Sequence, residues 1–212
     1  MVTILLTGFE PFGGDARNPS GEAVEHVVRA WDGPERLVPA ILPVSFDAAA
    51  EQLRALIGEH DPQIVVASGL AGGRTQVTPE RVAINLRDAR IPDNAGAQPL
   101  DEPSVAGGPA AYFATLPVKA IAQAIREAGV PAAVSHTAGT FVCNHVMYVA
   151  ADEASRRPGM RTGFVHVPWS ADTAPADAPS LPARDIAHAL RIAVRIAVDA
   201  PADAAVTAGT LH

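Results

Sequence analysis

The chain has 212 residues, of which 16 are basic and 23 acidic, so its formal net charge is -7 at neutral pH. This acidic balance argues against nucleic acid or an anionic membrane as the main partner. A single cysteine excludes an internal disulfide and favours a reducing, cytoplasmic location over a secreted scaffold. The length suits one compact α/β unit, and we predict a single domain over residues 1–212.

Apolar runs alternate with amphipathic segments in the first third of the chain. The predicted strands are residues 2–7, 37–44 and 63–68. Asn18 followed by proline is a helix-start signal, and a second helix is predicted over residues 46–57. Pro39 and Pro43 lack the N–H that a sheet ladder needs, so the second strand is expected near an edge of the sheet.

The rest of the chain continues this alternation after an extended segment and a long loop. Residues 77–86 have extended character, and residues 88–108 form a loop whose length is typical of functional or mobile segments. The predicted helices are residues 109–116, 118–128, 146–156 and 186–198, and the predicted strands are residues 132–136 and 163–167. This alternation predicts an α/β fold in which helices cover both faces of a mainly parallel sheet.

Cys143, the only cysteine, lies where a predicted strand turns into a helix. Unpaired backbone N–H groups and the positive end of the helix dipole lower the pKa of a thiol at such a position. The pattern therefore predicts a thiolate near neutral pH. Free cysteine is also among the most buried residue types, so a purely structural role stays open on position alone.

A nucleophilic thiol needs a base, and the sequence offers two histidines near it. His166 ends an apolar strand, at the edge where sites form in parallel sheets, although a histidine there is more often a satisfied core residue. His145 is expected to point away from Cys143 on their common helix, which favours a structural role. Glu80, an acidic residue in an apolar extended segment, is the candidate group that orients the base. The alternative for Glu80 is a salt bridge to an arginine such as Arg81.

Two glycine-rich loops, residues 8–14 and 69–74, follow predicted strands and permit a different function. Backbone N–H groups in such loops can cradle phosphate, but neither loop matches the P-loop or the full dinucleotide pattern. The function that would use them is that of a nucleoside-phosphorylase-like, phosphate-using glycosyl transferase, in which Cys143 is idle. A third hypothesis is a small-molecule binding protein without catalytic turnover. The sequence has no cysteine or histidine pair at metal-ligand spacing, so we expect neither a metal nor another cofactor.

Several short motifs run in one order across nearly the whole chain. They are Leu6 to Gly14 with Asn18-Pro19-Ser20, Ala71-Gly72-Gly73-Arg74, Glu80 to Asn85, Asp88 to Asn94, Gly108 to Tyr112, Leu116-Pro117, Gly139 to Asn144 and His166-Val167-Pro168. Together they resemble the pyrrolidone-carboxylate peptidase family, also called pyroglutamyl peptidase I, which consists of cysteine peptidases. Each glycine motif alone would be unspecific, whereas the ordered set is specific.

The resemblance implies an open three-layer α/β/α sandwich with a twisted, mainly parallel sheet. It also implies removal of N-terminal pyroglutamate (5-oxoproline) from peptides through a thioester acyl-enzyme. By the same resemblance Cys143 is the nucleophile, His166 the base and Glu80 the orienting carboxylate, while Arg90 supports the active site. The family is often a cytoplasmic homotetramer, so a homo-oligomer is expected.

The resemblance further implies that seven residues contact the pyroglutamyl ring. They are Phe9, Phe12, Asn18, Leu70, Ile91, Phe141 and Val142. Leu70 departs from the family, which often has glutamine there. The loss of a side-chain amide would weaken ring recognition, whereas a contact through the backbone would survive. Asn18 also has the competing role of helix cap, and one residue can do both.

Overall fold

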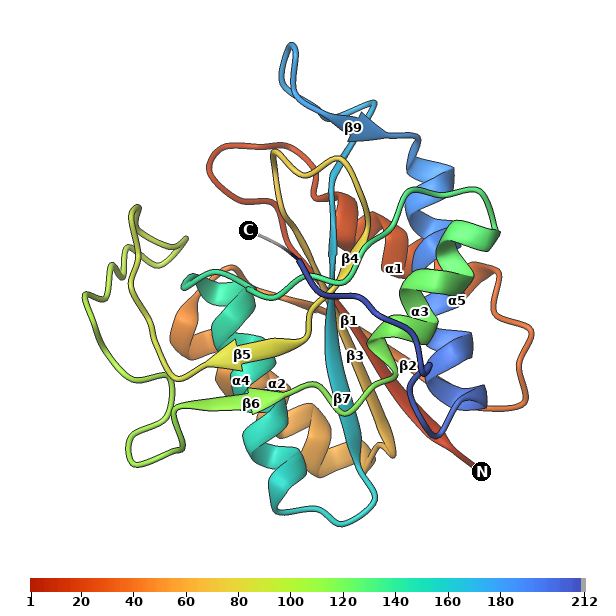
Figure 1. Cartoon of the computed structure of the whole chain (residues 1–212). Coiled ribbons are helices and arrows are strands. Elements are labelled where there is room, and N and C mark those ends of the chain that lie inside the picture. The colour runs from red at the N-terminus through yellow and green to blue at the C-terminus, as the bar shows by residue number, and fades with distance from the viewer. Residues whose placement is uncertain (211–212) are drawn as a thin grey trace.

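The computed structural model describes residues 1–210 and has a five-stranded sheet at its centre (Figure 1). Four parallel strands follow the order β2 (Arg36–Leu42), β1 (Thr3–Phe9), β3 (Ile64–Leu70) and β7 (Arg161–Val167). The short β4 (Thr78–Pro79) pairs with β7 in the antiparallel direction. The proline-containing β2 lies at one edge of the sheet, as predicted, because an edge strand leaves one side of its backbone unpaired.

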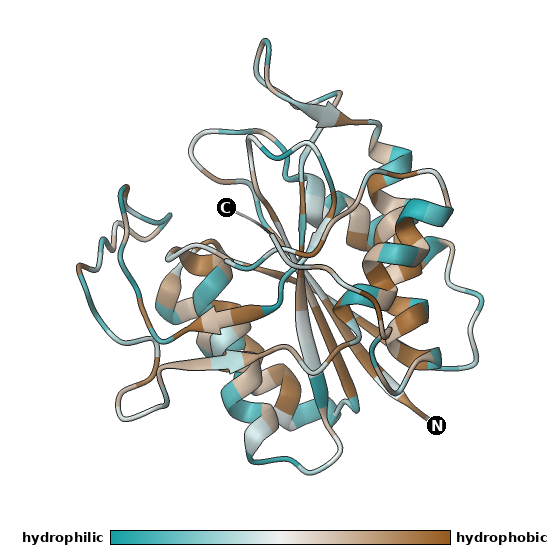
Figure 2. Ribbon diagram, viewed as in Figure 1, coloured by the Kyte–Doolittle hydropathy of each residue, from teal (hydrophilic) through white to brown (hydrophobic). Residues whose placement is uncertain are grey.

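Side chains of the central strands alternate between two hydrophobic cores, one on each face of the sheet. In β1, Ile4 and Leu6 belong to one core and Leu5 to the other. The covering helices are α1 (Pro19–Arg29), α3 (Val118–Glu127) and α5 (Ala183–Asp199) on the first face, and α2 (Phe46–His60) and α4 (Val142–Ser155) on the second. Figure 2 shows the hydrophobic residues concentrated on the central strands. The α/β/α sandwich prediction is confirmed.

The helix predicted over residues 109–116 is wrong. Ala111–Phe113 form the strand β6, which pairs antiparallel with β5 (Val82–Ile84). Tyr112 faces the protein and packs against Tyr148 of α4 with ring centroids 5.0 Å apart, while its neighbours on both sides are exposed. This alternation has the period of a strand, and pairing with β5 satisfies a backbone that local pattern alone assigned to a helix.

One further segment differs from the predictions. Residues 132–136, predicted as a strand, form only isolated bridges, from Ala132 to Val77 and from Ser135 to Glu80. The polar loop after Trp169 is closed by a short pair of strands, β8 (Trp169–Ser170) and β9 (Ser180–Leu181). Figure 1 shows β9 at the base of a loop that projects beyond the sheet.

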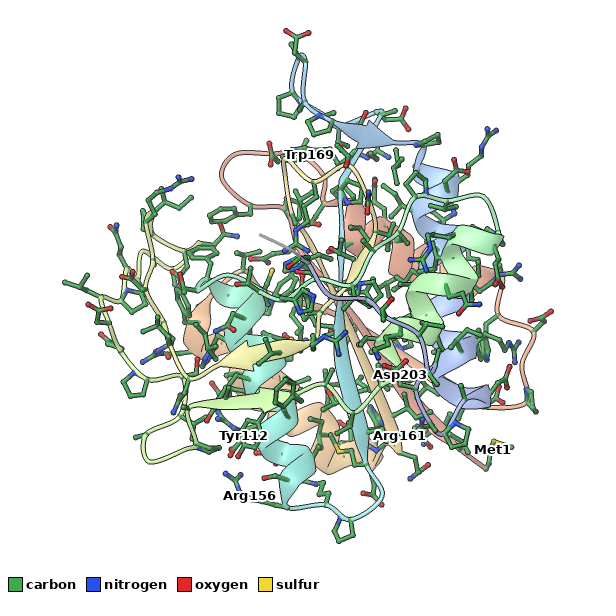
Figure 3. All side chains as sticks on the ribbon, viewed as in Figure 1. Met1, Tyr112, Arg156, Arg161, Trp169 and Asp203 are labelled. Atoms are coloured by element: carbon green, nitrogen blue, oxygen red, sulfur yellow. The ribbon has the colours of Figure 1, made fainter. Side chains whose placement is uncertain are left out.

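The parallel strands bring several loops to one end of the molecule. β1, β3 and β7 end at Phe9, Leu70 and Val167, and α4 begins at the same end. Trp169 lies there, at the end of the molecule opposite Met1 (Figure 3). Such carboxyl-terminal edges are where ligand sites form in α/β sheets. Among the helices within residues 1–210, none has the length and apolar character needed to cross a membrane.

Candidate active site

Cys143 lies in the first turn of α4, which begins at Val142 rather than at about residue 146 as predicted. Its sulfur packs on Gly69 of β3, where an added Cβ would lie 2.8 Å from Cys143 Sγ. Gly69 pairs in register with His166 of β7, and paired residues of parallel strands point to the same face of the sheet. The thiol and the imidazole are therefore neighbours on the face covered by α2 and α4.

The imidazole of His166 is held by Glu80. His166 Nδ1 donates a hydrogen bond to Glu80 Oε1 at 2.7 Å, which leaves Nε2 as the free acceptor nitrogen of the ring. Both residues are buried: His166 is 3% exposed and Glu80 0%. Glu80 follows β4 directly, and its backbone N–H bonds to Phe164 O at 2.9 Å, so the antiparallel pairing with β7 aims the carboxylate at the ring.

Arg74 supplies the positive charge that a buried carboxylate needs. Its Nη1 lies 2.6 Å from Glu80 Oε1, the same oxygen that accepts from His166. Arg74 also donates to Thr78 Oγ1, and its Nη2 donates to Thr137 O at 2.9 Å. Glu80 Oε2 has no hydrogen-bond partner within residues 1–210. The carboxylate therefore both orients the histidine and forms an ion pair, although with Arg74 rather than with Arg81.

Burial controls the protonation of the site. Burial, followed by the charge of Glu80, raises the pKa of the Cys143 thiol to about 12, although Arg74 and a backbone N–H act in the opposite direction. The thiolate predicted near neutral pH is thus wrong, because burial outweighs the helix start. Burial likewise lowers the pKa of His166 from 6.5, against the raising effect of Glu80. Both shifts favour the uncharged forms of the thiol and the imidazole.

Two cavities meet at Cys143. The apolar cavity, of about 450 Å³, contains all seven residues predicted to contact the ring. Those residues are Phe9, Phe12, Asn18, Leu70, Ile91, Phe141 and Val142. The second cavity, of about 520 Å³, is here called the polar cavity because His166, Arg74 and Asp88 line it. Residues 137–140 also line it, and it shares Leu70, Ile91 and Phe141 with the apolar cavity. Arg90 borders both cavities, is exposed, and makes no side-chain hydrogen bond or ion pair within residues 1–210.

Asn18 does both of the things expected of it. Its Oδ1 accepts from Ser20 N at 3.0 Å and caps α1, while its Nδ2 donates to Glu10 O at 2.8 Å. The side chain also lines the apolar cavity, and an amide nitrogen has a second hydrogen available for a ligand. Leu70 ends β3 and lines the same cavity, so at this point the cavity wall is aliphatic.

Three features of the site were not predicted from the sequence. Arg74 was recognised only as part of a glycine motif, Gly69 was not connected with the thiol, and Trp169 was not assigned to the cavity wall. The glycine spacing before Arg74 was the signal available for it. His145 packs on Phe46 of α2, with ring centroids 5.8 Å apart, as its expected structural role requires.

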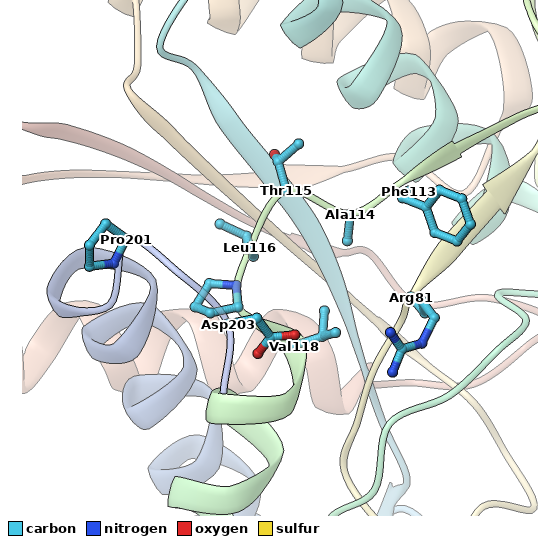
Figure 4. Close-up of a pocket in the computed structure, with 9 residues that line it drawn as sticks. Arg81, Phe113, Ala114, Thr115, Leu116, Val118, Pro201 and Asp203 are labelled. Atoms are coloured by element: carbon cyan, nitrogen blue, oxygen red, sulfur yellow. The ribbon is translucent and has the colours of Figure 1, made fainter. Parts of the chain in front are cut away.

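No other part of residues 1–210 shows comparable chemistry. A cavity of about 220 Å³ lies between the segment after β6 and the chain after α5 (Figure 4). Arg81, Thr115 and Asp203 are its polar lining residues. Cys143 is not among the residues that line it. In the described residues no three histidine, cysteine, aspartate or glutamate side chains gather as a metal site.

Known proteins resemble this chain in sequence and in fold. A sequence model of the pyroglutamyl peptidase family matches residues 2–200. The chain belongs to the pyroglutamyl peptidase family. Relatives named pyrrolidone-carboxylate peptidase, from Clavibacter michiganensis and Streptomyces coelicolor, are each 51% identical over 100% of both chains.

Solved structures with a similar fold belong to the same family as the sequence relatives. The pyroglutamyl peptidase I of Bacillus amyloliquefaciens has a TM-score of 0.93 and 48% identity, covering 98% of this chain and 100% of its own. The pyrrolidone carboxyl peptidase of Thermococcus litoralis has a TM-score of 0.89 and 38% identity, covering 94% of each chain. Pyroglutamyl peptidases are cysteine-type exopeptidases, so the family gives no support to the phosphorylase alternative.

Proposed function

We propose that this chain removes N-terminal pyroglutamate from peptides, with Cys143 as nucleophile, His166 as base and Glu80 as the orienting carboxylate. The observation that carries the proposal is the buried 2.7 Å bond between Glu80 and His166, beside a thiol that packs on the strand next to His166. A base held by a carboxylate next to a nucleophile is the general arrangement of covalent acyl transfer.

The chemistry begins from an uncharged pair. His166 Nε2 takes the thiol proton as Cys143 Sγ attacks the carbonyl carbon that joins pyroglutamate to the next residue. Glu80 stabilises the imidazolium that forms. Backbone N–H groups at the start of α4, assisted by Arg90, bind the developing oxyanion, and one such donor typically contributes about 3 kcal/mol. His166 then returns the proton to the leaving amine as the C–N bond breaks, and a thioester remains.

Water completes the cycle. His166 takes a proton from a water molecule that attacks the thioester, and it returns this proton to the sulfur as the C–S bond breaks. Pyroglutamate leaves and the thiol is restored. We also infer a side of the site for each product. Because His166 must reach the leaving nitrogen and lines only the polar cavity, the departing peptide occupies the polar cavity. The pyroglutamyl ring then occupies the apolar cavity.

The apolar cavity accounts for selectivity towards a blocked N-terminus. The lactam ring is compact and uncharged, and the rings of Phe12 and Phe141, 5.4 Å apart, offer a wall of matching character. A peptide with a free N-terminal ammonium would have to bury that charge beside these rings, which is costly. Leu70 in place of the frequent glutamine implies that the ring is recognised here without a side-chain amide at that position.

The direct test uses pyroglutamyl-aminomethylcoumarin. We expect cleavage by the wild-type chain, inactivation by iodoacetamide and no turnover by Cys143→Ala. Full activity of Cys143→Ala would remove the thiol from the mechanism. Glu80→Gln should lower the rate without unfolding the protein, which circular dichroism can check. Release of a base from nucleosides, dependent on phosphate and insensitive to thiol reagents, would instead select the phosphorylase alternative.

We also propose a setting for the enzyme. A single catalytic thiol that must stay reduced suits the cytoplasm. The family match over residues 2–200 and a sheet shared by both hydrophobic cores support a single domain over residues 1–212. A homotetramer is supported by the family resemblance and by the exposed apolar side chains of Leu100 and Phe113. Light scattering at micromolar concentration tests the assembly; a monomer would contradict it.

A further inference from the structure

The loop of residues 88–108 delivers two exposed side chains to the cavities. Arg90 and Ile91 border both cavities, and Ile91 is 47% exposed, so packing alone does little to fix this stretch. The loop contains no helix and no strand. Loops of this length are mobile unless something ties them down. Before Arg90 the loop is held at Asp88, which bonds to Thr140 through its backbone N–H and O. After Ile91 it is held at Asp93 and Asn94.

Asp93 caps a helix that is remote in sequence. It is 5% exposed, and its Oδ2 accepts a hydrogen bond of 2.9 Å from Phe46 N, the first residue of α2. Ser45, at the cap position itself, makes no side-chain capping bond. The carboxylate therefore satisfies an otherwise unpaired N–H at the positive end of the α2 dipole, where negative charge is favourable.

The second oxygen of Asp93 shapes its own loop. Asp93 Oδ1 accepts from Ala95 N at 2.9 Å and from Ala97 N at 2.8 Å. The backbone of Asp93 adds a bond from its N–H to Ala97 O at 2.9 Å. Both carboxylate oxygens of Asp93 therefore accept hydrogen bonds from backbone N–H groups. One residue thus folds the turn after Ile91 and fastens it to α2.

Asn94 joins the two walls of the apolar cavity. Its Nδ2 donates to Glu10 Oε1 at 2.8 Å and to Pro11 O at 3.0 Å. Glu10 and Pro11 lie between Phe9 and Phe12 in the sequence. The same Glu10 oxygen accepts from Val44 N at 3.1 Å, and Asn94 N donates to Val44 O at 2.9 Å.

We propose that Asp93, Asn94 and Glu10, here called the loop anchor, are positioning residues that hold Arg90 and Ile91 against the apolar cavity. The inference rests on the proposed function for the meaning of that cavity. None of the three anchor residues lines either cavity. They keep the loop in the conformation that binds substrate. The apparent Kd of the substrate rises in proportion as the fraction of molecules in that conformation falls.

The test compares variants that differ by one acceptor. Asp93→Asn keeps the shape of the side chain but offers one acceptor oxygen in place of two. Its NH2 group must therefore face either the N–H of Phe46 or the N–H groups of Ala95 and Ala97, and that hydrogen bonding is lost. We expect its KM for pyroglutamyl-aminomethylcoumarin to rise about tenfold, with a smaller change in kcat. The rate of Cys143 alkylation by iodoacetamide should be unchanged, and the amides of Ala95 and Ala97 should exchange hydrogen faster.

Glu10 supplies the rescue comparison. Glu10→Gln keeps an oxygen in place for Asn94 and Val44 and should stay near the wild-type KM, whereas Glu10→Ala loses the acceptor and should raise KM. The control is Glu102→Gln, which breaks the 2.8 Å ion pair with Arg87 in the same loop but away from Ile91. That change should leave KM and the exchange of Ala95 and Ala97 unaltered.

The outcomes separate the inference from the function on which it rests. An unchanged KM in Asp93→Asn, a fall in kcat alone, or an equal rise in KM in Glu102→Gln would overturn the loop anchor. If Asp93→Asn does not fold, Asn94→Ala gives the same readout without touching α2. If wild type does not cleave the substrate, the proposed function fails. Hydrogen exchange in Asp93→Asn and Glu102→Gln still decides whether the anchor holds the loop.

Discussion

Gly69→Ala places one methyl group between the sulfur and the sheet. The new Cβ would lie 2.8 Å from Cys143 Sγ and 2.8 Å from Phe164 Cζ. Carbon contacts are optimal at about 3.5 to 4.0 Å, so the sulfur, the ring or the strand must move by about 1 Å. The backbone conformation of Gly69 suits any residue, so the effect comes from contact alone.

The displacement predicts a specific kinetic loss. A misplacement of about 1 Å can lower a rate about 100-fold, and overpacking costs about 1 to 3 kcal/mol of stability. We therefore expect kcat of Gly69→Ala on pyroglutamyl-aminomethylcoumarin to fall about 100-fold while the protein still folds. The measurement is steady-state kinetics, with thermal unfolding to follow the fold.

A matched control is available in α2. Gly58 is a helical glycine with open space around its missing Cβ, so Gly58→Ala should keep full activity and stabilise the helix by about 1 kcal/mol. Wild-type kcat in Gly69→Ala, together with an unchanged rate of Cys143 alkylation, would refute the idea that the sulfur is seated on β3.

Three further predictions concern charge. Arg74→Gln removes the charged partner of Glu80 and should lower kcat at least tenfold, because a charge-assisted hydrogen bond contributes about 2 kcal/mol. It should also move the acid limb of the pH profile of kcat to higher pH, because Arg74 lowers the pKa of His166. Alkylation of Cys143 in the free enzyme should accelerate throughout the neutral range, since burial raises the pKa of its thiol to about 12; a plateau near pH 6 would contradict this. Burial lowers the pKa of His145 from 6.5 to about 4, so its contribution of about 3 kcal/mol is present above pH 6.5 and lost as pH falls towards 4. The free energy of unfolding in urea, measured for wild type and His145→Leu above pH 6.5 and again near pH 4, gives the size of that loss.

The central strands could be predicted from the sequence because each depends on a local hydrophobic pattern. Continuous apolar runs such as Ile4 to Leu6 are buried on both faces, and that burial is what a central parallel strand requires. The segment around Tyr112 was not accessible in this way. Its strand character comes from pairing with β5 and from packing on Tyr148, which are contacts between distant parts of the chain.

The site was predictable as a set of residues but not as a set of interactions. The motifs singled out Cys143, His166 and Glu80, whereas Arg74 could be joined to them only through the fold. The salt bridge and the orienting role had been alternatives for Glu80. The structure makes them compatible, since one oxygen, Oε1, receives both the His166 N–H and the Arg74 guanidinium.

The protonation state shows why a local rule failed at the thiol. A helix start lowers the pKa of a thiol, but that influence acts through a few dipoles, whereas burial removes the solvation of the whole charge. Burial moves the pKa of Cys143 to about 12 and that of His166 below 6.5, so the two move apart. A resting thiolate–imidazolium pair is then costly at ~1.4 kcal/mol per pKa unit. These directions favour proton transfer to His166 together with attack on the substrate, and Glu80 stabilises the imidazolium as it forms.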